Sequence, residues 1–161
     1  MSQRSIKKAA LLFGEGGKEV TFFNFLLKQE KFKFLENNWS FQTDHASGSS
    51  PKDVLTSCIE RKNDERSFAV VLCFIDLDKL IHDFPDDHQT QKSDLETLAA
   101  SENITIIWQH NDHEEELSRA TDGRIEGKSG MKRRLEINKD RIMRSAYVKR
   151  IFQYFYGTTE N

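Results

Sequence analysis

Acidic side chains follow two apolar runs of this 161-residue chain, at the places where strands would end. Glu15 lies in a glycine-rich turn directly after the apolar run 8–13. Asp76 and Asp78 follow the run 67–75, the most apolar in the chain. Residues two apart on a strand point to the same side, so both aspartates would face one site if the strand continues that far.

A fourth carboxylate, Glu19, lies four residues after Glu15 and near the start of a predicted helix, from which it could lean back toward the same place. Carboxylates that converge without cationic partners repel one another, and a bound divalent cation is the simplest compensation. Hard oxygen ligands favour Mg²⁺ or Mn²⁺ over soft metals. Two such ions can stabilise the attacking and leaving oxygens of a phosphodiester.

The elements that must position these side chains follow from the spacing of apolar residues. The predicted strands cover residues 8–13, 39–43, 67–75 and 104–108, and the predicted helices cover 18–34, a segment beginning at Ser50-Pro51, 90–100, 113–119 and 131–156. This alternation predicts an α/β fold, a three-layer sandwich with a mostly parallel central sheet and a C-terminal helical segment. Ligands of such folds bind at the carboxyl ends of the strands, where the acidic residues are expected.

Charge is unevenly distributed along the chain, although the net charge is only −2. Residues 76–122 contain 13 acids and 3 Lys or Arg, whereas residues 124–150 contain 10 Lys or Arg and 3 acids. One interpretation is a metal-holding acidic centre beside a basic phosphate-binding surface, and the other is two solvated faces that neutralise each other. The best candidates for contacts with a nucleic-acid backbone are Lys132, Arg133, Arg134, Arg141 and Arg144.

Several functional classes are excluded by composition and motifs. No apolar stretch approaches the roughly 20 residues of a membrane span, so we expect no membrane partner. Cys58 and Cys73 cannot make a disulfide framework, and we expect a cytoplasmic protein. The glycine-rich turn is neither a Walker A loop, because Leu12 and Glu19 occupy required positions, nor a GxGxxG loop.

Two short motifs in this order resemble the Toprim fold. They are Gly14-Glu15-Gly16-Gly17-Lys18-Glu19 after one apolar strand and Phe74-Ile75-Asp76-Leu77-Asp78 after another, about sixty residues later. With the loop Ser47-Gly48-Ser49, they are similar to the Toprim regions of RloB-like and OLD-type (overcoming-lysogenization-defect) nucleases. The resemblance covers roughly residues 8–120 of one expected domain, 1–161, whose basic helical segment is 124–156.

This resemblance implies that Glu15, Asp76 and Asp78 bind Mg²⁺, with Glu19 as a further ligand. The chain departs from the RloB-like pattern at Lys18, where that family carries threonine. After the fourth strand the family tends to show an acidic residue, and Glu114 or Glu115 could fill that place. The nearby pair His110 and His113 has the spacing of metal ligands, but no third strong ligand is evident. The two histidines could instead belong to the polar surface or to the rim of the acidic site.

Two functions follow from this reading. The first is a nuclease that cleaves DNA or RNA with Mg²⁺ or Mn²⁺, for which the resemblance implies a role in defence against phage or in the processing of RNA or DNA. The second is a non-catalytic subunit that binds nucleic acid or protein beside a separate ATPase chain, because the ATPase half of OLD-type proteins is absent here. Aromatic residues interleaved with the basic cluster could form an interface between copies of the chain, although such stripes also fit a core.

Overall fold

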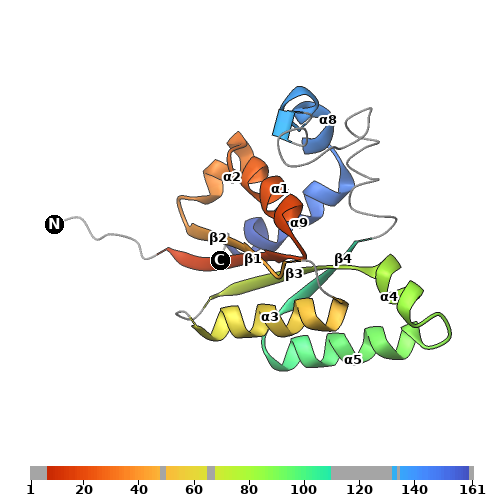
Figure 1. Cartoon of the computed structure of the whole chain (residues 1–161). Helices are drawn as coiled ribbons and strands as arrows, with labels where there is room; N and C mark the ends of the chain where they lie inside the picture. Colours follow the sequence, from red (N-terminus) through yellow and green to blue (C-terminus); the bar gives the residue numbers. More distant parts are fainter. Residues whose placement is uncertain (1–6, 48–49, 65–67, 110–131, 134, 160–161) are drawn as a thin grey trace.

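Figure 1 shows the structure, a computed structural model that describes residues 7–47, 50–64, 68–109, 132–133 and 135–159. Its sheet has four parallel strands in the order β2-β1-β3-β4. The strands are β1 (Lys8–Gly14), β2 (Trp39–His45), β3 (Val70–Asp76) and β4 (Thr105–Gln109). All four predicted strands and the parallel α/β class are therefore confirmed.

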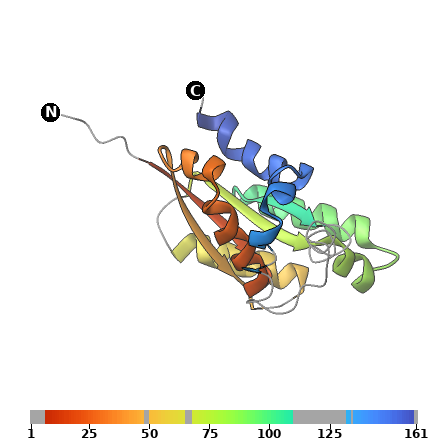
Figure 2. The ribbon, with the colours of Figure 1, turned by 90° about the horizontal axis from the view of Figure 1, so that it is seen from above.

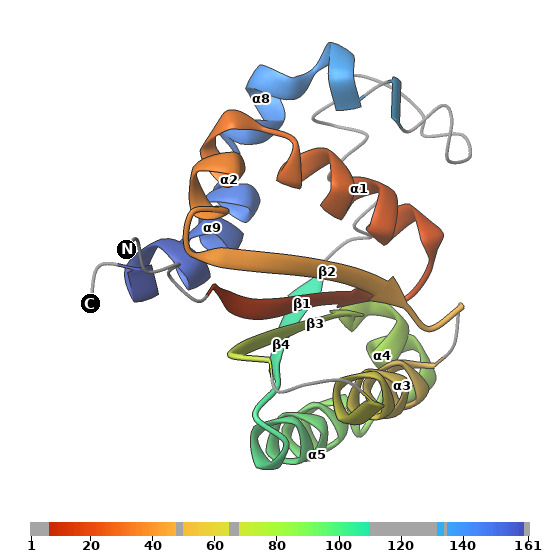
Figure 3. The ribbon, with the colours of Figure 1, turned by 90° about the vertical axis from the view of Figure 1, so that its left-hand side faces the viewer.

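Helices cover both faces of the sheet (Figure 3). They are α1 (Gly17–Leu27), α2 (Glu30–Leu35), α3 (Pro51–Asp64), α4 (Leu77–Asp83), α5 (His88–Ser101), α8 (Lys139–Met143) and α9 (Ala146–Thr159). On one face lie α1, α2 and α9, and on the other lie α3, α4 and α5. The predicted three-layer arrangement with a helical C-terminal segment is confirmed.

Two core clusters fill the spaces between the layers. Leu12, Leu72 and Phe74 of the sheet face α1 and α9, whereas the alternate residues Phe13 and Cys73 face α3, α4 and α5. Because β1 and β3 are buried on both faces, their sequences are almost continuously apolar, as is typical of central parallel strands. None of the helices in the described part of the chain is long and apolar enough to cross a membrane.

The helix expected over 18–34 is wrong in its length, because it consists of two helices. Helix α1 ends at Leu27, and Gln29 takes an extended conformation (φ −75°, ψ 146°) before α2 begins at Glu30. The Gln29 amide Nε2 donates to the Phe25 carbonyl at 3.0 Å. The bend allows α2 to bury Phe32, whose ring meets Phe152 of α9 edge-on at 5.5 Å. The helix expected over 113–119 lies outside the described residues.

Helix α9 lies beside α1 on the same face of the sheet (Figure 2). The rings of Phe22 in α1 and Tyr147 in α9 stack with their centroids 5.9 Å apart. Gln109, at the end of β4, is only 4% exposed, and its Nε2 donates to the Tyr147 hydroxyl at 3.0 Å. A buried amide needs such a partner, so this bond links α9 to the carboxyl end of the sheet.

Removing the Tyr147 hydroxyl tests this link. In Tyr147→Phe the ring stays in place, but the buried Gln109 amide loses an acceptor. We expect the free energy of unfolding to fall by about 1–3 kcal/mol, measured by urea denaturation. Tyr156→Phe is the control, since Tyr156 is 39% exposed on the same helix and its ring stack on Phe152 survives. Equal stabilities of the two variants would contradict a structural role for the Gln109–Tyr147 bond.

Candidate functional site

The direction of chain crossing reverses between β1 and β3. From β1 the chain passes through α1 and α2 to β2 on one side, whereas β3 lies on the other side of β1 and is reached through α3 on the opposite face. Helices therefore diverge from the carboxyl ends of these two strands. In open α/β sheets this switch point is where ligands bind. Glu15 directly follows β1, and Asp76 is the last residue of β3.

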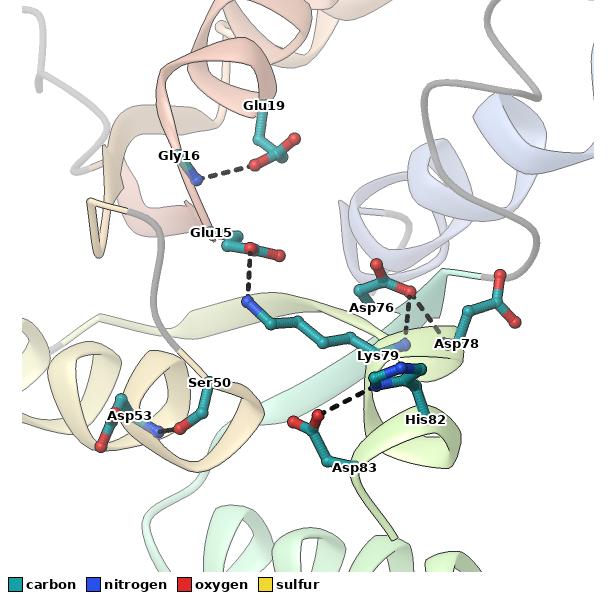
Figure 4. Close-up of polar contacts among 10 residues, drawn as sticks. All are labelled: Glu15, Gly16, Glu19, Ser50, Asp53, Asp76, Asp78, Lys79, His82 and Asp83. Atoms are coloured by element: carbon teal, nitrogen blue, oxygen red, sulfur yellow. Dashed lines mark hydrogen bonds and ion pairs between the residues drawn. The ribbon is translucent and has the colours of Figure 1, made fainter. Parts of the chain in front are cut away.

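The turn after β1 is shaped by a close approach between the strand and α1. A Cβ atom at Gly14 would lie 2.5 Å from Cβ and 2.9 Å from Cγ of Glu19, so a larger residue does not fit without movement. The Glu19 carboxylate Oε1 accepts the Gly16 N–H at 2.7 Å and closes the start of α1. The Glu19 carboxylate therefore stabilises the start of α1, and Figure 4 shows it farther from Asp76 than Glu15 is.

Asp76 ends β3 and starts α4. Its Oδ1 accepts the backbone N–H groups of Asp78 at 2.9 Å and Lys79 at 3.2 Å, which satisfies two donors of the first helical turn. The strand therefore does not continue to Asp78, and the condition for both aspartates to face one site is not met. Asp78 lies in the first turn of α4, and Figure 4 shows its carboxylate directed away from Glu15.

A lysine that the sequence analysis missed occupies the space between the two strand ends. Lys79 Nζ lies 3.3 Å from Glu15 Oε1, with the two side chains 37% and 27% exposed. Figure 4 shows Lys79 extending from α4 past Asp76 to Glu15. The signal was present, because the spacing of Leu77 and Leu80 fits a helix that begins after Asp76 and carries Lys79 on its first turn.

A histidine at the end of β2 was also missed, because the predicted strand stopped two residues early. His45 pairs with Gly14 in the register of β1 and β2, next to Glu15. Its Nδ1 accepts the Ser47 N–H at 3.1 Å, so a neutral ring carries its proton on Nε2. Ser47 takes a left-handed conformation (φ 65°), which is uncommon for a residue other than glycine. The neutral His45 ring therefore has an N–H hydrogen-bond donor, at the carboxyl end of the strand next to β1.

The acidic residues suit a hard divalent cation only in part. Within the described residues, no group of three or more His, Cys, Asp or Glu side chains is arranged to hold a metal ion. Mg²⁺, however, usually keeps several waters and is bound by one or two carboxylates together with substrate phosphates. Glu15 and Asp76 supply two such carboxylates. The cap does not exhaust the acceptor capacity of Asp76, since a carboxylate has about four lone-pair sites.

Cysteine chemistry plays no part at this edge. Cys58 of α3 and Cys73 of β3 are both fully buried between the layers. A hydrogen bond with Cys58, burial and the proximity of that second thiol raise the pKa of Cys73 well above its usual value. Cys73 therefore stays protonated at neutral pH, and protonated thiols are poor nucleophiles.

The predicted basic residues do not gather at the carboxyl edge. Lys132, Arg133, Arg141 and Arg144 are exposed, and Figures 1 and 3 place α8 on the outer side of α1. Lys132 lines a cavity of about 170 Å³ together with Lys28, which directly follows α1. Other predicted positions lie outside the described residues: Gly48, Ser49, His110, His113, Glu114, Glu115 and Arg134.

Comparisons of the chain with protein-family models, with curated proteins and with solved structures find no match. The functional interpretation therefore depends on the sheet edge itself. Its central components are the carboxylates of Glu15 and Asp76 and the ammonium group of Lys79, and His45 ends the neighbouring strand β2.

Because Asp76 caps α4, two substitutions separate the contribution of its cap hydrogen bonds from that of its charge. Asp76→Ala removes the N-cap, and we expect a loss of about 1–2 kcal/mol in the free energy of unfolding. Asp76→Asn keeps an oxygen acceptor for the cap and loses only the favourable charge at the helix start, which contributes about 0.3–1 kcal/mol. Urea denaturation of both variants measures the difference. Equal losses would show that the cap observed for Oδ1 contributes nothing to stability.

Proposed function

We propose that this protein is a Mg²⁺-dependent nuclease that cleaves phosphodiester bonds of DNA or RNA at the carboxyl edge between β1 and β3. The observation that supports it is the placement of Glu15 and Asp76 at the ends of two neighbouring strands at the switch point of the sheet. The resemblance to Toprim nucleases supports the same residues, because its glutamate and first aspartate fall at these two strand ends. Action in the cytoplasm and in defence against phage is part of this proposal.

In this proposal Glu15 and Asp76 hold the cation, and Mn²⁺ can replace Mg²⁺. When bound, the cation supplies Lewis-acid activation of the phosphodiester. Binding of a cation by Glu15 competes with the ion pair to Lys79, so the ammonium group becomes available for a phosphate oxygen of the substrate. Lys79 then neutralises charge that develops on the phosphate.

His45 is a candidate for orienting the substrate. Its Nδ1 accepts the Ser47 N–H, so the neutral ring presents Nε2–H as a hydrogen-bond donor. In this proposal that N–H would donate a hydrogen bond to a phosphate oxygen and would keep its proton. Exposed Lys132, Arg133, Arg141 and Arg144 add positive charge through which a longer nucleic acid is attracted.

A second candidate function is a non-catalytic subunit that binds nucleic acid or protein, beside a partner ATPase or as a homo-oligomer. The observation that favours it is the Lys79–Glu15 ion pair, because a lysine already neutralises the carboxylate that a metal would need. In that case the acidic edge is structural, with Asp76 as a helix cap and Glu15 as the partner of Lys79.

A cleavage assay decides between the two functions. Wild type is incubated with Mg²⁺ or Mn²⁺ on single-stranded DNA, double-stranded DNA and structured RNA, beside Asp76→Asn and Asp94→Asn. Asp94 is exposed on α5 and makes the matched control for loss of one carboxylate. We expect metal-dependent cleavage that falls at least about 100-fold in Asp76→Asn, equivalent to about 2.7 kcal/mol of barrier, and is unchanged in Asp94→Asn.

Two outcomes would contradict the nuclease proposal. Cleavage by Asp76→Asn at the wild-type rate would show that the activity does not use this edge. Absence of cleavage on every substrate by folded wild-type protein would favour the non-catalytic subunit.

A further inference from the structure

A cavity of about 210 Å³ opens between the start of α3, the end of α4 and helix α5. Pro51, Leu80 and Leu95 form a buried apolar floor. Phe84 lines the same cavity and is 40% exposed, so its ring is a hydrophobic surface open to solvent. Sites for small ligands usually combine an apolar lining with a small number of polar groups.

The cavity adjoins the carboxyl edge that carries Glu15 and Asp76. Helix α3 begins at Pro51, after the carboxyl end of β2, and α4 runs from the Asp76 cap to Asp83, next to Phe84. Ser50, directly before α3, and Asp83 of α4 both line the cavity. The cavity is therefore bounded by two helices that begin after the carboxyl ends of β2 and β3.

The polar residues at the cavity match a ring that also forms hydrogen bonds. Gln91 lines it, and its Nε2 donates to Asp87 Oδ2 at 3.1 Å, which orients the amide. The Asp83 carboxylate and the Ser50 hydroxyl group also line the cavity. Lys52, which is exposed on α3 and lines the cavity, carries a charge that suits a phosphate. An apolar floor, an aromatic ring, hydrogen-bonding groups and one cation together match a nucleotide.

We propose that this cavity binds one unpaired base of the nucleic acid whose backbone lies at the carboxyl edge. The inference deepens the proposed function and depends on it for the position of the backbone. The base stacks on Phe84 and its edge meets the Gln91 amide. A base inside a duplex cannot enter, so single-stranded or locally unpaired nucleic acid is favoured.

The size of the cavity favours a base over a protein segment. Specific protein interfaces bury about 800 Å² on each partner, whereas this cavity accommodates a single planar group. A second copy of the chain or a partner protein at this place is treated below as an outcome of the test.

Binding of oligonucleotides by the full chain tests the proposal. Fluorescence anisotropy of a labelled single-stranded DNA is measured with Ca²⁺ in place of Mg²⁺, for wild type, Phe84→Ala and Phe34→Ala. Phe34 is the matched control, because it is 58% exposed on α2, across the sheet from the cavity. We expect Phe84→Ala to weaken binding about tenfold, within the range for loss of one stacked base, and Phe34→Ala to bind like wild type.

A second pair of variants reports stacking directly. In Phe84→Trp an indole replaces the ring, and a base stacked on it is expected to quench its fluorescence as single-stranded DNA is added. Phe34→Trp carries the same indole outside the cavity and should not be quenched, and wild type corrects for Trp39 and Trp108. Thermal melting of each variant verifies that it is folded.

Several outcomes would overturn the inference. They are equal binding by Phe84→Ala and Phe34→Ala, an unquenched indole at position 84, or no binding of nucleic acid by wild type. A changed oligomeric state in Phe84→Ala, without loss of oligonucleotide binding, would assign the cavity to another copy of the chain.

The results that would contradict the proposed nuclease function differ from those that would contradict the base site. If wild type and Asp76→Asn both bind single-stranded DNA through Phe84 but neither cleaves, the nuclease proposal is wrong and the base site stands. If wild type cleaves while Phe84→Ala binds and cleaves equally well, only the base site is wrong.

Discussion

The capping of α4 by Asp76 determines the arrangement of the whole sheet edge. Two backbone N–H groups of the first helical turn converge on Asp76 Oδ1, at 2.9 and 3.2 Å, and this contact ends β3 and begins a helix without an intervening loop. Because the helix starts there, Lys79 is carried across to Glu15 and Asp78 is turned away. The end of the same helix forms one wall of the cavity that Phe84 lines. One carboxylate thus connects the fold, the charge balance of the edge and the adjoining cavity.

In the proposed function, the Lys79 ammonium group and a divalent cation would compete for Glu15. In this structure the Lys79 ammonium group neutralises Glu15, which lowers the repulsion between Glu15 and Asp76 at neighbouring strand ends. A divalent cation would do the same with a higher charge and would leave Lys79 for a phosphate. Glu15 and Asp76 are positioned by the ends of β1 and β3, whose residues are buried on both faces of the sheet. The ion pair is therefore compatible with a resting state of a metal site as well as with a purely structural edge.

The positions of the strands could be predicted from the sequence, but the structure of the turns that follow them could not. Apolar runs located all four strands, since parallel strands buried on both faces require such runs. The spacing of Asp76 and Asp78 was interpreted with strand geometry, and an N-cap reading of Asp76 would have predicted α4 and found Lys79. The pairing of His45 with Gly14 depends on sheet register, and the switch point between β1 and β3 depends on strand order. Both are set by contacts between segments distant in sequence, which periodicity does not encode. The break between α1 and α2 at Gln29 could not be predicted, because no glycine or proline marks it in the sequence.

The central claim, that the carboxyl edge holds a divalent cation, is tested most directly by calorimetric titration of Mn²⁺ into the full chain. Wild type is compared with Glu15→Gln and with Glu30→Gln, a matched control on the exposed surface of α2. We predict that Glu15→Gln binds Mn²⁺ at least about tenfold more weakly, as expected for loss of a metal-site interaction, that Glu30→Gln binds like wild type, and that Lys79→Met binds more tightly because the competing ammonium group is gone. Equal Mn²⁺ binding by wild type and Glu15→Gln, or no binding by wild type, would contradict the account.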